Sequence, residues 1–220
     1  MDSLPKRGIC MYKTKVMIVD DQFTSRQLFD LYIKQSENYE TVCMVKSASE
    51  ATAYLRSTKV ELILMDILMN DGSNGLDTAA AVKKLWPDIK IIAVTSMAEA
   101  SWLKMARQIG IDSFWFKDTS KETILSVMDR TMAGESVYPD NPPLVKLGCA
   151  VSSEFTEREL DVLRCMTKGM SNAAIGKKLG MSENTVKTHI QHMLDKTGYE
   201  NRTELAIEAR ISGAVVSLEP

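Results

Sequence analysis

The sequence predicts an α/β protein: a doubly wound, five-stranded parallel sheet, followed by a smaller domain made of helices. In the first part of the chain, short apolar runs alternate with stretches whose apolar residues recur at helical spacing. Continuous apolar strands that alternate with such helices are typical of a parallel sheet covered on both faces. Beyond a proline-rich stretch at Pro139–Pro143, only helical patterns remain.

Five strand and helix pairs can be placed in order along the first part of the chain. The strands are predicted at Val16–Val19, Thr41–Val45, Leu62–Met65, Ile91–Val94 and Phe114–Phe116. The first helix is marked by a stripe of Leu28, Phe29, Tyr32 and Ile33, and the others by Ser49–Arg56, Leu76–Trp86, Trp102–Ile109 and Ile124–Thr131. Each strand therefore has its own crossover helix.

The chain of 220 residues divides at its prolines. Its length suggests one or two domains, at roughly 100–200 residues per domain. Three of the six prolines lie in Pro139–Pro143, and proline cannot continue a helix. We therefore predict a sheet domain at 12–134, a linker at 135–152 and a helical domain at 153–217.

Composition excludes several classes of protein. Hydrophobic residues make up 45% and charged residues 25%, which is the balance of a globular protein and not of a disordered chain or coiled coil. No apolar run reaches the roughly 18 residues that a membrane span needs. The four cysteines lie far apart, which favours reduced thiols and a cytoplasmic protein. Because the net charge is −2, any affinity for nucleic acid must come from a local basic patch.

Polar residues follow four of the predicted strands at their carboxyl ends, where parallel sheets bind ligands. They are Asp20 and Asp21, then Asp66, Thr95 and Lys117. Three carboxylates held together repel one another unless a hard cation such as Mg²⁺ lies among them.

These residue types suit phosphoryl chemistry. A carboxylate beside Mg²⁺ can attack a phosphoryl group and form an aspartyl-phosphate. Asp66 stands alone on the middle strand and is the best candidate for this nucleophile, while Asp20 and Asp21 are better placed as metal ligands. Thr95 and Lys117 could bind the phosphoryl oxygens by hydrogen bond and by charge.

This part of the sequence resembles the receiver domain of two-component response regulators. The resemblance is carried by the acidic pair, the Leu62–Asp66 strand, Thr95 after Ala-Val and Lys117 after Trp-Phe, with separations of 45, 29 and 22 residues from Asp21 onward. It implies a flavodoxin-like fold, Asp66 as phosphoacceptor, and a Mg²⁺ site made by Asp20, Asp21, Asp66 and the backbone carbonyl of Leu68. It also implies that Phe114 reorients with Thr95 on activation; the alternative for Phe114 is an ordinary core aromatic.

The loop after the phosphoacceptor departs from the family pattern. Receivers usually carry Met-Pro soon after the acceptor and a glycine eight positions after it. Here Met69 is followed by Asn70, and Gly75 lies nine positions after Asp66. The loop borders the site, so the lifetime of the phosphoryl group does not follow from the resemblance.

The second part of the chain contains four predicted helices. Thr156 and Glu159 form a capping box that opens the first helix, and Ser171 and Ser182 cap the next two. Gly169, Gly180, Gly198 and Gly213 stand where the four helices end. The second and third helices, joined by Gly180-Met181, make a helix-turn-helix.

A local excess of positive charge accompanies this motif. Between Arg164 and Arg202 there are seven Lys or Arg residues against three acidic ones, a local charge of +4 in a chain of −2. Basic residues grouped around a helix-turn-helix favour contacts with DNA phosphates.

Residues 153–215 resemble the LuxR-type DNA-binding domain. The motifs are Thr156–Glu159, Gly169–Ile175 and Ser182–His189. The resemblance implies that Lys187, Thr188 and Gln191 contact bases, and that Lys177, Ser182 and Thr185 contact the phosphate backbone. It also implies a dimer contact on the fourth helix, from Ala206, Ile207 and Arg210 in some combination; the alternative is that these residues belong to the core of the domain.

Together the two resemblances identify the chain as a member of the NarL/FixJ class of response regulators. They imply that a histidine kinase phosphorylates Asp66, that the phosphorylated chain forms a homodimer, and that it binds double-stranded DNA to regulate transcription, with no role for a membrane. One alternative is a constitutive DNA-binding regulator whose receiver only dimerises. An enzyme of the haloacid-dehalogenase type is disfavoured, because Gln22 and Leu68 stand where it needs a second acid.

Overall fold

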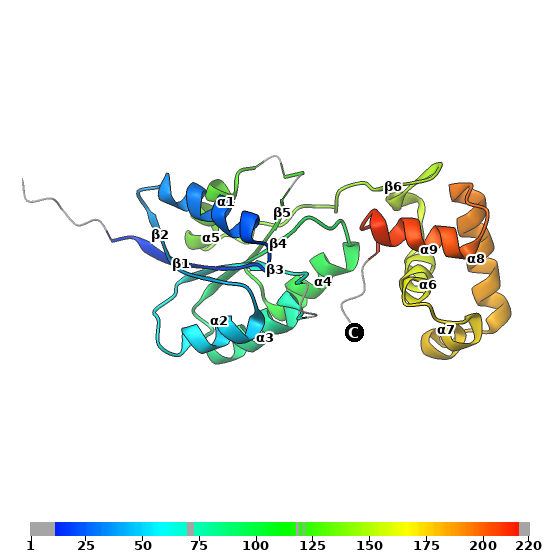
Figure 1. Cartoon of the computed structure of the whole chain (residues 1–220), viewed down its shortest axis with the longest axis horizontal. Coiled ribbons are helices and arrows are strands. Elements are labelled where there is room, and N and C mark those ends of the chain that lie inside the picture. Colours follow the sequence, from blue (N-terminus) through cyan, green and yellow to red (C-terminus); the bar gives the residue numbers. More distant parts are fainter. Residues whose placement is uncertain (1–11, 70–72, 118, 121, 216–220) are drawn as a thin grey trace, which may run out of the picture. The chain divides into compact units, whose positions relative to one another are not determined.

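A computed structural model describes residues 12–69, 73–117, 119–120 and 122–215 (Figure 1). The chain forms two compact units. The first contains the chain up to Val94, together with Ile109–Ser113 and Glu122–Val137. The second contains Thr95–Gln108, Phe114–Lys121 and the chain from Tyr138 onward.

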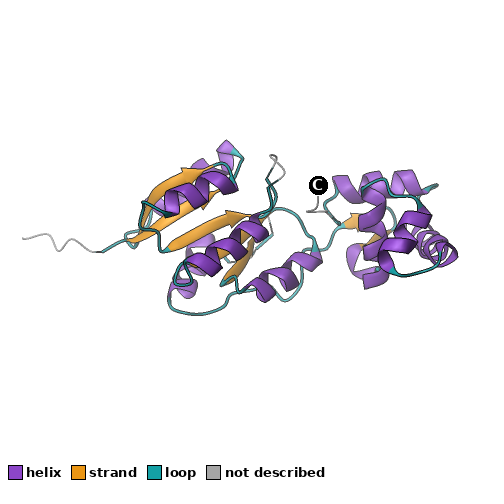
Figure 2. Ribbon diagram, turned by 90° about the horizontal axis from the view of Figure 1, so that it is seen from below, coloured by secondary structure: helices purple, strands orange, loops and turns teal. Residues whose placement is uncertain are grey.

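The predicted five-stranded sheet is confirmed. Its strands are β1 (Thr14–Val19), β2 (Tyr39–Val45), β3 (Leu62–Asp66), β4 (Lys90–Thr95) and β5 (Ser113–Phe116). They lie in the order β2-β1-β3-β4-β5, and β1 pairs in parallel with both β2 and β3. Figure 2 shows the strands in orange and the helices in purple. The side chains of Val16–Val19 and Leu62–Met65 are buried, which explains why these two segments are apolar at every position.

Helices cover both faces of this sheet. They are α1 (Phe23–Lys34), α2 (Ala48–Leu55), α3 (Gly75–Leu85), α4 (Ala100–Ile109) and α5 (Ile124–Met132). In Figure 1, α1 and α5 lie on one face and α2 and α3 on the other. The doubly wound arrangement predicted from the sequence is therefore correct.

The inward face of α1 differs from the predicted stripe. Phe29 and Ile33 are buried, but Leu28 is 47% exposed. Asp30 is buried in its place and forms an ion pair of 2.6 Å with Lys34, four residues further along the helix. Leu28 was therefore wrongly assigned to the buried face of the helix. The carboxylate of Asp30 can be buried there because it keeps its ion-pair partner, Lys34, within the same helix.

A short loop brings the start of α3 against the end of β3. Gly75 N–H donates to the carbonyl of Ile67 at 2.9 Å. A Cβ atom built on Gly75 would lie 1.9 Å from the carbonyl oxygen of Asp66, which is backbone and cannot move aside cheaply. The tight approach therefore requires glycine at this position.

We expect Gly75→Ala to destabilise the protein by about 2–3 kcal/mol, because the added methyl group must displace the Asp66 backbone. Urea unfolding followed by circular dichroism measures the change. Gly134→Ala is the matched control: its φ of +94° is strained for alanine, but nothing lies within 4 Å of the added atom, so its cost should be only about 1 kcal/mol. Equal costs for the two variants would contradict a collision at Gly75.

Two lysines and a backbone amide converge on Asp112 at the amino-terminal end of the sheet. Asp112 accepts hydrogen bonds from Lys83, from Lys90 at 3.0 Å and from the N–H of Ile91 at 2.9 Å. Burial works to raise the pKa of this carboxyl, but the hydrogen bonds from Lys83, Ile91 and Lys90 outweigh it and hold the pKa below its ordinary value. The ionised form of the Asp112 carboxyl therefore stabilises the folded state.

A carboxyl whose pKa is depressed by folding contributes stability above its unfolded pKa, and loses that stability as the pH falls through its folded pKa. We expect the unfolding free energy to decline below the unfolded value of about pH 3.8. Asp112→Asn should lower the unfolding free energy by about 2 kcal/mol at pH 7. It should also make the unfolding free energy decline less steeply at low pH. Urea unfolding at a series of pH values measures both effects. If the variant loses stability at low pH as steeply as the wild type, other carboxyls cause that loss.

The predicted all-helical domain has its four helices in the expected places. They are α6 (Glu157–Thr167), α7 (Asn172–Leu179), α8 (Glu183–Thr197) and α9 (Arg202–Ile211). Thr156, Ser171 and Ser182 cap α6, α7 and α8 through their side chains. Gly180 and Gly198 end α7 and α8 in the left-handed conformation that glycine favours, with φ of 67° and 74°.

A small hairpin precedes these helices, within the segment predicted as linker. Strands β6 (Lys146–Leu147) and β7 (Ala150–Val151) pair in antiparallel fashion. Leu147 and Ala150 are buried in the same core as the helices, and Cys149 N–H donates to the carbonyl of Thr197 at 2.9 Å. The domain boundaries remain a prediction, but this part of the segment packs with the helices.

None of the helices in the described ranges is both long enough and apolar enough to span a bilayer. Among the described residues, Cys43, Cys149 and Cys165 form no disulfide bond.

Candidate functional site

Three carboxylates meet at the carboxyl ends of the neighbouring strands β1 and β3. Asp20 and Asp21 follow β1, and Asp66 is the last residue of β3. One oxygen from each lies within 4.8 Å of the others. Asp20 and Asp66 are buried, whereas Asp21 is half-buried. The structure therefore brings together the acidic residues that the sequence predicts for one site.

Hydrogen bonds fix the backbone around Asp20. Its carboxylate accepts from Gln22 N–H at 2.8 Å, and its own N–H donates to the carbonyl of Val45 at 3.1 Å. The guanidinium of Arg26, on the first turn of α1, donates to the Asp20 carbonyl at 2.6 Å. The loop between β1 and α1 is thus held to β2 on one side and to α1 on the other.

The chemistry of this cluster suits a small divalent cation. Mg²⁺ prefers oxygen ligands and is usually held by one or two carboxylates together with water and phosphate oxygens. Three clustered carboxylates supply such ligands, and without a cation they repel one another. The cluster is therefore typical of a Mg²⁺ site.

The remaining predicted ligand lies at the edge of the described chain. Leu68 faces Asn74 across an isolated antiparallel bridge. The role of its carbonyl as a metal ligand stays a prediction. Asn70, where the sequence departs from the family pattern, lies outside the described residues.

Thr95 and Lys117 are joined by their backbones. Thr95 ends β4, and its carbonyl accepts a hydrogen bond of 2.9 Å from the N–H of Lys117. The Thr95 hydroxyl accepts from Met97 N–H at 3.1 Å. Phe114, in β5, is buried, with its ring centroid 5.1 Å from Phe116. The roles assigned to Thr95, Lys117 and Phe114 remain predictions.

We expect Asp21→Asn to raise stability in EDTA by about 1 kcal/mol, because it removes one of three mutually repelling charges. The same change should weaken Mg²⁺ binding by roughly tenfold or more, since a neutral amide replaces a carboxylate ligand. Thermal unfolding with and without Mg²⁺ and titration calorimetry measure these effects. Asp88→Asn, an exposed carboxylate in the turn before β4, is the control. A variant that loses stability in EDTA would contradict repulsion within the cluster.

The helix-turn-helix is formed by α7 and α8. The turn is tight: a Cβ atom on Gly176 would lie 2.6 Å from the carbonyl oxygen of Met181. Val186, Ile190 and Met193 bury one face of α8 in the domain core. The opposite face is left exposed along three turns.

All six residues predicted to contact DNA are exposed, on α7, on α8 or at the cap of α8. They are Lys177, Ser182, Thr185, Lys187, Thr188 and Gln191. Several of their side chains have partners one turn away: Lys187 pairs with Glu183 at 2.9 Å, and Gln191 donates to Asp195 at 2.8 Å. Such exposed pairs contribute little stability and can be exchanged for other partners. The DNA contacts themselves stay a prediction.

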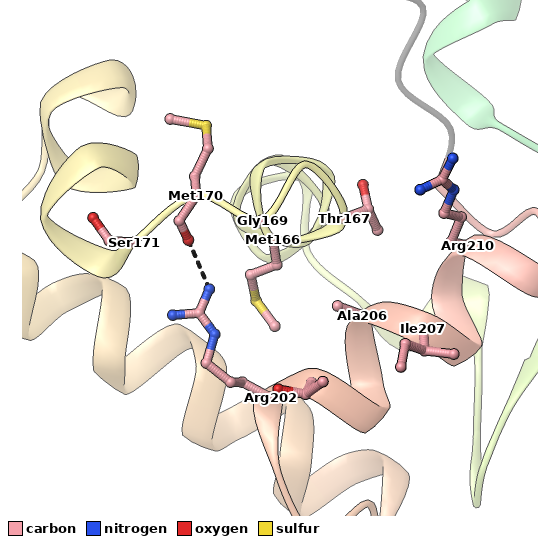
Figure 3. A pocket seen from close by; sticks show the side chains of 10 residues that line it. Met166, Thr167, Gly169, Met170, Ser171, Arg202, Ala206, Ile207 and Arg210 are labelled. Carbon is pink, nitrogen blue, oxygen red and sulfur yellow. Dashed lines mark hydrogen bonds between the residues drawn. The ribbon is translucent and has the colours of Figure 1, made fainter.

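A groove runs between α6 and α9, with a volume of about 380 Å³ (Figure 3). Ala206, Ile207 and Arg210, predicted as a dimer contact or as core, all line it. Ala206 packs partly against the core, but Ile207 is 51% exposed and Arg210 is also exposed. The core of α9 consists instead of Leu205 and Ala209.

The count of basic residues overstates the positive charge that is exposed at the surface of the helix-turn-helix. Among the seven basic residues counted from the sequence, Arg164, Lys196 and Arg202 are not fully exposed, and each donates to protein groups in the second unit. Arg164 bonds to Asp161 at 2.9 Å and to the buried Glu99 at 2.6 Å. Lys196 and Arg202 likewise bond to the protein. A charge count cannot separate these internal contacts from exposed ones.

Comparison with known families matches the two parts of the chain separately. Residues 16–129 match the response regulator receiver domain, and residues 153–209 match the luxR family of bacterial regulatory proteins. These families are transcription regulators and not enzymes.

One relative and two solved structures cover nearly the whole chain. The response regulator protein VraR of Staphylococcus aureus strain NCTC 8325 is 34% identical over 201 residues, which are 89% of this chain and 95% of VraR. A structure of two RcsB dimers bound to two parallel DNAs has a TM-score of 0.61 at 18% identity, covering 93% of this chain and all of that one. RcsB from Salmonella enterica serovar Typhimurium, bound to a promoter with the phosphomimetic BeF3⁻, gives the same values. At this identity the two structures show the fold alone.

Proposed function

Because this chain belongs to the two-component response regulators with a LuxR-family DNA-binding domain, we propose that phosphorylation of Asp66 by a histidine kinase controls its binding to DNA. The observation that carries the proposal is the acidic cluster at the ends of β1 and β3. It supplies both a nucleophile and two further carboxylates for a cation.

The phosphoryl transfer starts from a phosphohistidine of the kinase. A carboxylate oxygen of Asp66 attacks phosphorus, a P–O bond forms, and the P–N bond to the imidazole breaks. The imidazole leaves with that electron pair and takes up a proton. Asp20, Asp21 and the Leu68 carbonyl would hold Mg²⁺, which when bound neutralises charge on the phosphoryl oxygens.

Thr95 and Lys117 would bind the transferred group. The sheet order makes β4 the neighbour of β3, with β5 beyond it, so the residues that end these strands share the edge that carries Asp66. Lys117 would pair with a phosphoryl oxygen by charge, and Thr95 would donate its hydroxyl hydrogen. Because a hydroxyl can donate and accept at the same time, this bond would be compatible with the one that Thr95 accepts from Met97 N–H.

The output is binding of double-stranded DNA through α8. A capped helix with one buried and one polar, exposed face, preceded by a tight turn, is the form that enters the major groove in helix-turn-helix proteins. Lys187, Thr188 and Gln191 lie on the exposed face and would read bases. Lys177, Ser182 and Thr185 would contact the backbone. RcsB binds DNA as dimers, which supports a homodimer here. We also infer a cytoplasmic location, which agrees with three cysteines that form no disulfide bond.

Beryllofluoride with Mg²⁺ stands in for the phosphoryl group, so it tests the acceptor and the output together. We expect it to convert the wild-type chain from monomer to dimer, as measured by light scattering on a sizing column. We also expect it to tighten binding to a duplex selected from a random-sequence pool by at least roughly tenfold, or ~1.4 kcal/mol. Asp66→Ala should show neither effect, because it lacks the carboxylate that binds the mimic.

Asp88→Ala is the matched control, since it removes an exposed carboxylate outside the cluster and should respond like wild type. Tight DNA binding by wild type and Asp66→Ala alike, with no change in mass, would overturn the switch. That result would favour a constitutive DNA-binding regulator whose receiver only dimerises.

A further inference from the structure

Arg202 ties the start of α9 to the start of the helix-turn-helix. One guanidinium nitrogen donates to the side-chain oxygen of Asn172 at 2.7 Å. Another donates to the backbone carbonyl of Met170 at 2.8 Å, the dashed line in Figure 3. Met170 lies in the turn before α7, and Asn172 is the first residue of that helix. A single planar side chain therefore fixes both the turn and the helix that follows it.

Lys196 ties the other end of the motif to the start of α6. Its ammonium lies in the last turn of α8 and donates to both carboxylate oxygens of Glu159, at 2.7 and 3.0 Å. It also donates to the carbonyl of Glu154 at 2.9 Å and lies over the ring of Phe155, 5.5 Å from its centroid. An ammonium has three donors, and these contacts use all of them.

The partner of Lys196 is a buried carboxylate with a second structural task. The Glu159 side chain is only 4% exposed, and it also accepts from the N–H and hydroxyl of Thr156, closing the capping box of α6. Burial works to raise the pKa of Glu159, but the hydrogen bonds from Lys196 and Thr156 outweigh it and hold the pKa below its usual range. The charged pair is thus built into the domain and is not a loose surface contact.

We propose that Lys196 and Arg202 are positioning residues for DNA binding: they hold the two ends of the helix-turn-helix and make no contact with phosphate. The inference rests on the proposed DNA binding and assigns to these two residues a role opposite to the one that the charge count suggests. The three donors of Lys196 and two donors of Arg202 are directed at protein acceptors, so these donors already have partners before a duplex binds. The orientation of α8 in the groove depends on them instead.

Salt dependence separates a positioning residue from a phosphate contact. Each phosphate neutralised by a protein cation releases condensed counterions, so log K falls against log salt with a slope of about −0.9 per contact. Loss of a positioning residue weakens the base contacts but leaves this slope unchanged. Loss of a phosphate contact weakens binding to every sequence and reduces the slope.

The experiment measures the affinity of the full chain, with beryllofluoride and Mg²⁺, at a series of salt concentrations. The probes are the duplex selected by the wild-type chain and a duplex of unrelated sequence. We expect Lys196→Met and Arg202→Met each to bind the selected duplex about tenfold more weakly, with a smaller loss on the unrelated duplex and no change in slope. Lys177→Met should instead reduce the slope by about 0.9 on both duplexes. Lys84→Met, on an exposed face of α3, should change neither.

Two further variants guard against simple loss of folding. Lys196→Arg keeps the charge and can bond Glu159, so it should recover most of the affinity. Glu159→Gln keeps an acceptor for Thr156 but loses the ion pair, so it should reproduce the effect of Lys196→Met, and the double variant should be no worse than either single one. Circular dichroism confirms that each variant has kept its helices.

The outcomes are distinct from those of the proposed function. A wild-type chain that binds neither duplex would refute DNA binding itself. Binding by wild type, with a slope that falls by about 0.9 in Lys196→Met or Arg202→Met, would overturn the positioning role and make that residue a phosphate contact. Unchanged affinity in folded Lys196→Met and Arg202→Met would overturn it as well.

Discussion

The first unit depends on holding three carboxylates within 4.8 Å of one another at a sheet edge. Like charges at that distance disfavour the folded state, so the surrounding structure must fix them there. Two adjacent strands that are buried along their length supply the rigid base. The pairing of β1 with β3 makes the ends of these strands neighbours, and Arg26 and Gln22 secure the loop that carries Asp20. The same repulsion makes the cluster typical of a Mg²⁺ site, because a cation placed there would relieve it.

The helical part of the chain uses its charges in the opposite way. There Lys196 and Glu159 form a shielded pair whose attraction and hydrogen bonds offset the cost of burial. Such a pair is better suited to fixing geometry than to adding stability, because removing either partner leaves a charge without compensation. The first unit concentrates like charges at the end of its sheet, whereas the helical domain pairs opposite charges in a contact between two of its helices.

Much of this follows from the sequence, for reasons visible in particular residues. Thr156, Ser171 and Ser182 cap helices by contacts within a few residues, so their pattern is readable directly. The acidic cluster was predictable because strand ends in a parallel sheet converge. Burial of Asp30 in place of Leu28 was not, since a stripe of apolar residues does not show which carboxylates are buried. Nor were the bonds of Arg202, which join segments distant in sequence. The hairpin at 146–151 is local, but its strands are only two residues long and it packs against the distant residue Thr197.

The repulsion within the acidic cluster also limits how far a phosphoryl group could shift the equilibrium between two conformations of the receiver. A ligand shifts an equilibrium between two conformations only by the difference in its free energy of binding to them. In the proposed switch, cation and phosphoryl group would both bind where repulsion is relieved, so part of their binding energy would stabilise the receiver in either conformation. Only contacts that differ between the two conformations, such as the proposed hydrogen bond from the Thr95 hydroxyl to phosphate, would distinguish them. The size of the response would therefore depend on those contacts and not on how tightly the cluster binds a cation.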